Sequence, residues 1–485
     1  ASPFRRAISA SQTFAFLDTD VSFMSVTPTR LTPPSTSYWS IIKLSAPIWV
    51  SNLAIVGGST IDTLMAGHLG PTDLAGVAIG IAVSISIFVG LVGIMQGLSP
   101  IAAHHLGAGK HEKIGPELHQ TLWIAVFLSI IGVLVMTYTP LWMTLTNAQG
   151  ETAKIASLYL IINAIGLPGA MAGRAYLALN AAVSRPKIAM WISLLMLALK
   201  APFNALFMYG WGPIPALGGA GCAVSSALTS WITLLLFWGI WHFDSFYVRM
   251  RSETFSLPNW KIMAAQLKLG IPIGLSAFFE VTSFTFMTIF ISRLGEVTVS
   301  GHQIVANLTS LFYMLPLSIG VTASVLVSQS LGAGSAESAR RATFNCLKFG
   351  ICCAVVVSLI LYFFKYFFVE LYTDNASVIA ISALLIPFAA FYHIFDATNC
   401  IGSFAMRGYR ITFAPMVLYG VLLWGIGLGL GSLLTFTDTL TAAPLGARGY
   451  WSAITIGLTI SGIVVGFLAV MVANNTVKGK KVWLK

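Results

Sequence analysis

The sequence predicts an all-α integral membrane protein with twelve transmembrane helices in two pseudo-symmetric bundles of six. Of the 485 residues, 56% are hydrophobic and only 9% are charged, whereas a soluble globular protein is about 25% charged. A chain with so few charges cannot cover a water-facing surface, which excludes a soluble enzyme and a disordered protein. The other two observations are a series of long apolar segments and a repeat of the first half of the chain in the second.

The basic character of the chain does not indicate a nucleic-acid-binding protein, although its net charge is +11. Nucleic-acid-binding proteins gather Lys and Arg on one face or groove. Here these residues occur in twos and threes between apolar segments, the pattern that sets the orientation of helical membrane proteins. All five cysteines lie within apolar segments without metal-ligand spacing, so we expect them to pack and not to bind a metal.

Twelve apolar segments are long enough to cross a bilayer core of about 30 Å as helices. They span residues 43–66, 74–105, 117–140, 153–178, 188–210, 219–242, 268–291, 300–330, 342–369, 376–404, 412–435 and 449–473. This pattern predicts five regions. They are a disordered N-terminal tail (1–40, in which Met24 is an alternative start of translation), an N-lobe (41–242), a cytoplasmic linker (243–262), a C-lobe (263–473) and a basic cytoplasmic C-terminal tail (474–485).

The distribution of Lys and Arg predicts that both termini are cytoplasmic. An even number of spans places the termini on one side, and positive charge is enriched in cytoplasmic loops. The side opposite the tails has little beyond Lys154, Arg293, Lys365 and Arg448. The tail side has Lys110, Lys113, Arg185, Lys187, Arg249, Arg251, Lys261, Arg340, Arg341, Arg407, Arg410, Lys478, Lys480, Lys481 and Lys485.

The two halves of the chain repeat in register. Residues 43–109 align without a gap with residues 268–334, so that Pro47 meets Pro272 and the Leu-Gly-Ala-Gly sequence at 106–109 recurs at 331–334. Six helices separate the copies, and an even number gives both halves the same topology, with an axis along the membrane normal. Two repeated lobes with a site between them favour a transporter that works by alternating access.

Thirteen of the 16 acidic residues lie in the tail, in loops or near the ends of predicted helices, and three do not: Asp62, Glu280 and Asp396. A charge at mid-membrane costs at least about 2.5–3.5 kcal/mol, which implies a partner, a proton or a function. An apolar neighbourhood disfavours the charged form of Glu280. Asp396 follows Tyr392 by one turn and shares its helix face, which predicts hard ligands for Na⁺ or a proton site. The structural alternative is a buried ion pair with Arg174 or Lys200.

Enzyme motifs are weak in this sequence. The Gly-Ala-Gly-Lys at 107–110 lacks the Gly and Ser/Thr positions of a phosphate loop, and its copy at 332–334 lacks the Lys. Neither an HExxH zinc helix nor a GxSxG elbow is present. A membrane-embedded lipid enzyme therefore has little support, and we expect no enzymatic activity and no cofactor beyond a coupling ion.

Several segments between about residues 41 and 473 resemble the multidrug and toxic compound extrusion (MATE) transporters, close to the NorM type. The likeness implies a V-shaped arrangement of the two bundles. The segments that carry it are Ile61–Gly67, Phe278–Val281, Gly301–Gln303, Met314–Gly320, Tyr392, Asp396 and Arg407–Tyr409.

The resemblance implies roles for six residues. Glu280, Tyr392 and Asp396 match positions that bind the coupling cation, with Na⁺ possible at the two acids. Asp62 matches an acid of the N-lobe that is important for transport, and Asn204 and Gln303 match polar cavity positions. Two departures stand out: Asn180 where relatives often have Asp, and Ile411 where an acid is common.

The resulting hypothesis is a Na⁺- or H⁺-coupled antiporter that exports organic cations and drugs across a bacterial inner membrane. Its expected partners are the lipid bilayer and small amphipathic or cationic molecules, without nucleic acid, and it is expected to work as a monomer. A lipid-linked oligosaccharide flippase of the same superfamily is the nearest alternative. Its anionic substrate requires a basic cavity, whereas this chain places three central acids against Arg174 and Lys200.

Overall fold

The structure is a computed structural model that describes residues 32–252 and 254–480. Twelve helices in these residues are long and apolar enough to cross a membrane, which confirms the number predicted from the sequence. Most of the predicted N-terminal tail (1–31) and the last five residues of the predicted C-terminal tail lie outside the described residues. The remainder of the C-terminal tail is partly helical, because the last helix continues to Val477.

The first half of the chain contains six of the spans. Their helices are α1 (Tyr38–Leu69), α2 (Pro71–Met95) continued by α3 (Leu98–Gly107), α4 (Ile114–Thr137), α6 (Gly150–Ala182), α7 (Pro186–Tyr209) and α8 (Gly221–Phe243). A short helix, α5 (Thr139–Thr146), follows α4. The side chain of Ser37 accepts a hydrogen bond from the backbone N–H of Ser40 at the start of α1, which satisfies one of the free donors of the first turn.

The second half repeats this order. Its helices are α9 (Trp260–Ser292), α10 (Glu296–Gly332), α11 (Ala336–Phe363), α13 (Ala376–Gly408), α14 (Phe413–Tyr419) continued by the π-helical η4 (Gly420–Leu430) and α15 (Gly431–Phe436), and α16 (Ala447–Val477). A short helix, α12 (Lys365–Glu370), takes the place of α5. Asn259 and Asn375 cap α9 and α13 with their side-chain oxygens.

Three predicted spans differ from the helices that form. The second span is interrupted at Gln96 and Gly97, between α2 and α3. The third ends at Thr137 and not at residue 140, since Pro140 has no N–H with which to continue the helix. The ninth ends at Phe363, because the chain turns at Phe364 and starts α12. The hydrophobicity of the sequence alone does not predict these turns.

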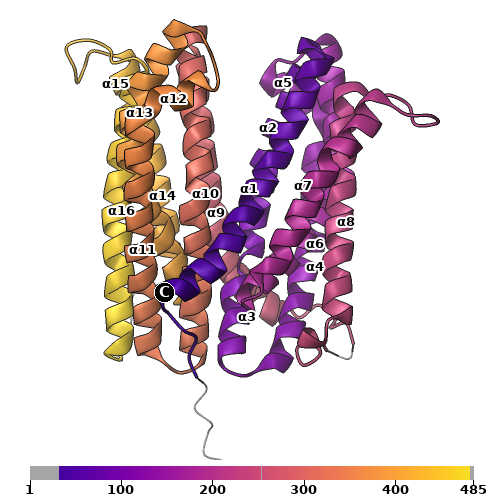
Figure 1. Ribbon diagram of the computed structural model, residues 1–485, viewed down its shortest axis with the longest axis vertical. Coiled ribbons are helices and arrows are strands. Elements are labelled where there is room, and N and C mark those ends of the chain that lie inside the picture. Colours follow the sequence, from indigo (N-terminus) through magenta and orange to yellow (C-terminus); the bar gives the residue numbers. More distant parts are fainter. Residues whose placement is uncertain (1–31, 253, 481–485) are drawn as a thin grey trace, which may run out of the picture.

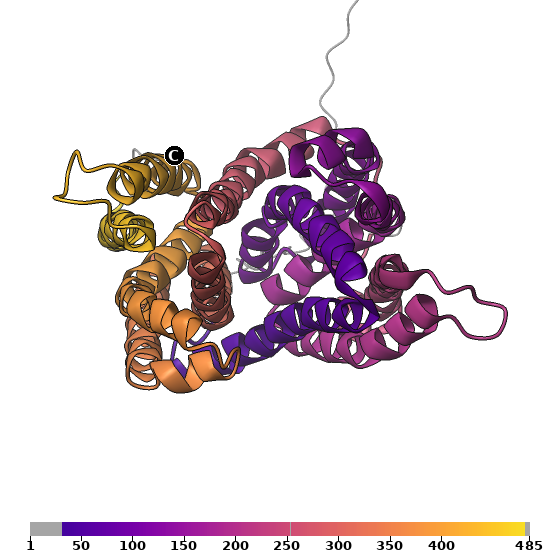
Figure 2. The same ribbon diagram turned by 90° about the horizontal axis from the view of Figure 1, so that it is seen from above.

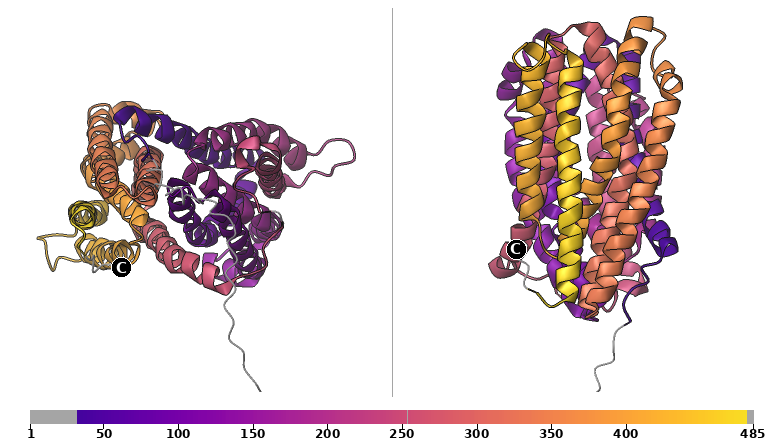
Figure 3. Two further views of the ribbon diagram at one scale, coloured as in Figure 1. Left: turned by 90° about the horizontal axis from the view of Figure 1, so that it is seen from below. Right: turned by 90° about the vertical axis from the view of Figure 1, so that its left-hand side faces the viewer.

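The helices form two bundles that diverge toward one end of the molecule, as Figure 1 shows. Seen from above (Figure 2), most helices of the first half (indigo to magenta) and of the second half (salmon to yellow) lie in two groups, which are in contact through α1 with α10 and α2 with α9. The helices of the second bundle run side by side along the long axis (Figure 3). The equivalent helices α6 and α13 lie at the centres of their bundles, where α6 contacts α2, α4 and α8, and α13 contacts α10, α11 and α16.

The bundles meet at the end where α3 and α10 finish. Helix α3 packs on α10 there, and Gly107 lies so close to the carbonyl group of Gln329 that a Cβ would overlap it. The equivalent Gly332 lies in the same way against the carbonyl of His104. The Nε2 of Gln329 donates to the carbonyl of Ala182 at 2.8 Å. The repeated Leu-Gly-Ala-Gly sequence therefore closes one end of the V.

Candidate functional site

A cavity of the C-lobe contains both acids that the sequence singled out in this half. Its volume is about 550 Å³, and Glu280 of α9 and Asp396 of α13 both line it. Gln303 of α10 and Tyr392 of α13 line the same cavity. Four of the six predicted site residues are therefore brought together from three helices.

Neither Glu280 nor Asp396 belongs to an ion pair in the described residues. Asp396 is 8% exposed, and Glu280 is half-buried. Tyr392 is 2% exposed, and its ring stacks on Trp451 with centroids 6.1 Å apart, which fixes the side chain beside Asp396. Two carboxyl groups that form no ion pair among the described residues therefore line one cavity.

Close packing between α9 and α2 forms one wall of this cavity. Gly274 of α9 lies against the backbone of Gly90 in α2, where a Cβ would come within 2.6 Å of the carbonyl oxygen. Only glycine allows two helix backbones to approach so closely. This contact links α9 of the second bundle to α2 of the first, and residues of α2, among them Gln96, reach the C-lobe cavity.

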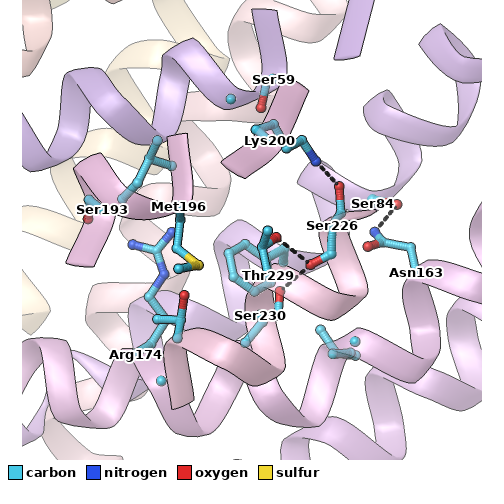
Figure 4. A pocket seen from close by; sticks show the side chains of 18 of the residues that line it. Ser59, Ser84, Asn163, Arg174, Ser193, Met196, Lys200, Ser226, Thr229 and Ser230 are labelled. Atoms are coloured by element: carbon cyan, nitrogen blue, oxygen red, sulfur yellow. Dashed lines mark hydrogen bonds between the residues drawn. The ribbon is translucent and has the colours of Figure 1, made fainter. Parts of the chain in front are cut away.

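The remaining two predicted site residues, Asp62 and Asn204, meet in the N-lobe, where Asp62 lines a separate cavity of about 320 Å³ and Asn204 is fully buried beside it. The Nζ of Lys200 lies 3.0 Å from Oδ2 of Asp62, and Nδ2 of Asn204 donates to Oδ1 at 2.7 Å. Lys200 also donates to Ser226 at 2.6 Å, as Figure 4 shows. Asp62 therefore adopts the ion pair that the sequence left open as the structural alternative, and it lies apart from the acids of the C-lobe.

Arg407 is a functional candidate that the sequence analysis placed elsewhere, among the charges of the tail-side loops. The helix α13 continues to Gly408, so Arg407 belongs to its last turn, and the side chain lines the C-lobe cavity. Its Nη1 donates to Oε1 of Gln96 at 3.0 Å. The signal available in the sequence was the apolar run before Arg407, which the predicted end of the span at residue 404 cut short.

A multidentate transition-metal site is not formed in the part of the chain that the structure describes, where no three His, Cys, Asp or Glu side chains gather. The oxygen groups of the C-lobe cavity, two carboxyls and a phenol, suit a small hard cation or a proton.

The sequence matches the MatE family model over residues 47–206 and again over residues 272–433. The chain belongs to the MatE family. The two matches begin at Pro47 and Pro272, which the internal repeat aligns. The MatE family therefore accounts for the repeat as well as for the twelve membrane-spanning helices.

Relatives within the MatE family are similar over nearly their whole lengths. The chain is 36% identical to a probable multidrug resistance protein NorM of Chromobacterium violaceum, over 88% of this chain and 92% of that protein. It is 32% identical to multidrug resistance protein MdtK of Yersinia pseudotuberculosis, over 87% and 93% respectively. The crystal structure of the eukaryotic MATE transporter AtDTX14 has the same fold, with a TM-score of 0.82, 20% identity, and coverage of 91% of this chain and 98% of that one.

Proposed function

We propose that this protein is a cation-coupled antiporter that exports amphipathic, often cationic organic compounds by alternating access. The observation that carries the proposal is the C-lobe cavity, which Glu280 and Asp396 both line and where neither forms an ion pair in the described residues. Two such groups in a membrane are costly unless they bind a cation or a proton. A site that is filled and emptied in each cycle meets that requirement.

The coupling cation and the cationic substrate would compete for the same negative charges, and this competition would couple their transport. Na⁺ or H⁺ arriving at Glu280 and Asp396 neutralises the carboxylates, so the cavity attracts a cationic substrate less and releases it. One charge that moves through 100 mV supplies about 2.3 kcal/mol, which sustains a substrate gradient of about 40-fold. Tyr392 adds a phenolic oxygen beside Asp396.

The closed end of the V is the cytoplasmic end in this proposal. Lys110 and Lys113 follow α3, and Arg340 and Arg341 lie in the first turns of α11, both at the end where the bundles meet. Positive charge is retained on the cytoplasmic side, so the V opens outward and both termini are cytoplasmic. The bacterial relatives support a place in the inner membrane, and each chain contains both lobes, so a monomer suffices.

The names of the relatives support the export of drugs over the transfer of lipid-linked oligosaccharides, and transport over catalysis. The charge of the C-lobe cavity supports the same choice. It contains two acids and one arginine, which suits a cation better than a polyanionic lipid-linked sugar.

Export of ethidium into the lumen of inside-out vesicles, whose cytoplasmic face points to the medium, tests the proposal, with Na⁺ and pH gradients imposed separately. Glu280→Gln and Asp396→Asn each remove a charge whose attraction to a nearby cation is about 1–4 kcal/mol, so coupled efflux should fall at least about 5-fold. The matched control is Glu296→Gln, which removes an exposed acid at the start of α10. Efflux at the wild-type rate by both cavity variants, with normal expression, would refute the assignment.

A further inference from the structure

A third cavity lies between the two lobes and contains two arginines and no acid. Its volume is about 160 Å³, and helices of both bundles contribute to it. Arg174 of α6 lines this central cavity and the N-lobe cavity. Arg407 of α13 lines this central cavity and the C-lobe cavity. The two arginines therefore both line this small central cavity, and each also lines one of the two larger cavities.

The charge of neither arginine is matched by an acid at contact distance. No ion pair of the described residues includes Arg174 or Arg407. Arg407 packs over the ring of Phe404 at 3.6 Å from its centroid and donates to Gln96, and Arg174 lies 5.4 Å over Phe88. These aromatic and amide neighbours orient the guanidinium groups but leave their charge in place. Arginine stays protonated even when buried.

Part of each arginine side chain remains exposed. Both are half-buried, and in Figure 4 the Arg174 side chain points along the N-lobe cavity toward Ser193 and Met196, on the opposite side from Lys200. A guanidinium presents its donors as a planar fork that matches a carboxylate. An unpaired cation at membrane depth is costly. An anionic group of a bound ligand would offset that cost.

We propose that Arg174 and Arg407 form a subsite for the carboxylate of an organic substrate in the central cavity. The inference rests on the proposed transport function and specifies a substrate class. A volume of 160 Å³ is below the roughly 300–1,000 Å³ of a site for a whole drug-sized molecule, so the carboxylate occupies it and the rest of the molecule extends past Arg407 into the C-lobe cavity. A zwitterion then places its cationic end near Glu280 and Asp396.

The test compares two ligands that differ only in this charge, a fluoroquinolone and its methyl ester, in equilibrium binding to the purified full-length protein at neutral pH. Charge-assisted hydrogen bonds predict that the acid binds about 10-fold or more tightly than the ester. Arg174→Gln and Arg407→Gln should each reduce this preference sharply, and Arg174→Lys should keep part of it. Arg448→Gln, an exposed arginine at the start of α16, is the matched control.

The wild-type comparison needs no variant, so a folding defect cannot obscure the result. Equal affinity of the wild-type protein for acid and ester would overturn the carboxylate subsite while leaving the antiporter proposal intact. The carboxylate subsite would also be overturned, and the antiporter proposal left intact, if Arg174→Gln and Arg407→Gln both bound the acid more tightly than the ester to the same extent as the wild type. If acid, ester and ethidium all fail to bind, the transport proposal fails and the subsite fails with it.

Discussion

The ammonium group of Lys200 lies 3.0 Å from a carboxylate oxygen of Asp62, inside the N-lobe. Both side chains are buried, with exposures of 6% and 4%, and Asn204 holds the second carboxylate oxygen. Asp62 therefore meets a tethered cation, whereas Glu280 and Asp396 face an open cavity. The two lobes share a fold, but only the central acid of the N-lobe is neutralised by an ion pair. We therefore expect a coupling ion to bind in the C-lobe.

Removing one partner of this ion pair should destabilise the protein. Lys200→Met leaves a buried carboxylate without its cation, at a cost of about 3–5 kcal/mol. The double variant Asp62→Asn, Lys200→Met should recover much of that loss, because no uncompensated charge remains. Unfolding of the purified protein in mixed micelles measures the free energy. The exposed Lys154, paired with Glu151 at 3.0 Å, supplies the control Lys154→Met, which should change little. Equal losses at the two lysines would contradict the expectation.

The close contacts at Gly107 and Gly332 should control how firmly the bundles close. Gly107→Ala or Gly332→Ala introduces a methyl group that overlaps a backbone carbonyl of the other bundle, and overpacking costs about 1–3 kcal/mol. Hydrogen exchange of the backbone around α3 and the end of α10 should accelerate. Gly239→Ala is the control, since its added Cβ meets open space. Unchanged exchange in both variants would show that this contact does not hold the end closed.

A hydrogen bond between Asn180 and Tyr247 should stabilise the end of α6. The Tyr247 hydroxyl donates to Oδ1 of Asn180 at 2.7 Å, and both residues are buried. Asn180 also donates to the carbonyl of Tyr176, so both the nitrogen and the oxygen of this amide, which stands where relatives often have Asp, are hydrogen-bonded. Asn180→Leu leaves the hydroxyl without an acceptor, at a cost of about 1–3 kcal/mol.

A double-mutant cycle with Tyr247→Phe isolates this interaction. The hydrogen bond should appear as a coupling energy of about 1 kcal/mol between the two sites. Purely additive effects of the two substitutions on the free energy of unfolding would mean that the bond contributes nothing to stability.

The stability of the corner between α8 and α9 should depend on acid pH. The backbone N–H of Phe246 donates to Asp244 at 2.9 Å and, together with the paired Arg185, lowers the pKa of Asp244 below its ordinary value of 3.8. A lowered pKa in the folded state means that the stabilisation is complete above the unfolded pKa and is lost as the pH falls through the folded one.

The melting temperatures of the wild-type protein and Asp244→Asn should therefore differ by a constant amount at neutral pH and converge below about pH 4. Asp374→Asn, an exposed acid before α13, corrects for general effects of lost charge. A difference between wild type and Asp244→Asn that does not shrink in acid would contradict the lowered pKa.

The sequence by itself determined the twelve helices, the repeat and the three central acids. In a membrane each backbone N–H and C=O must be satisfied within its own helix, so an apolar segment of sufficient length becomes a helix from local information alone. The cost of a charge in lipid is equally local, which is why Asp62, Glu280 and Asp396 stood out. The sequence did not predict the turns at Gln96 and Phe364, because a bend within an apolar segment does not change its hydropathy.

Only the tertiary structure decided which of these groups meet. Asp62 pairs with Lys200 because α1 packs on α7, and Glu280 faces Asp396 across a cavity because α9 and α13 belong to the same bundle. Arg174 and Arg407 approach one space from opposite lobes. Which side chains come together depends on the rotation of each helix about its axis and on contacts between residues far apart in the chain. Packing of small and large side chains across helices sets that rotation, and no single segment encodes it.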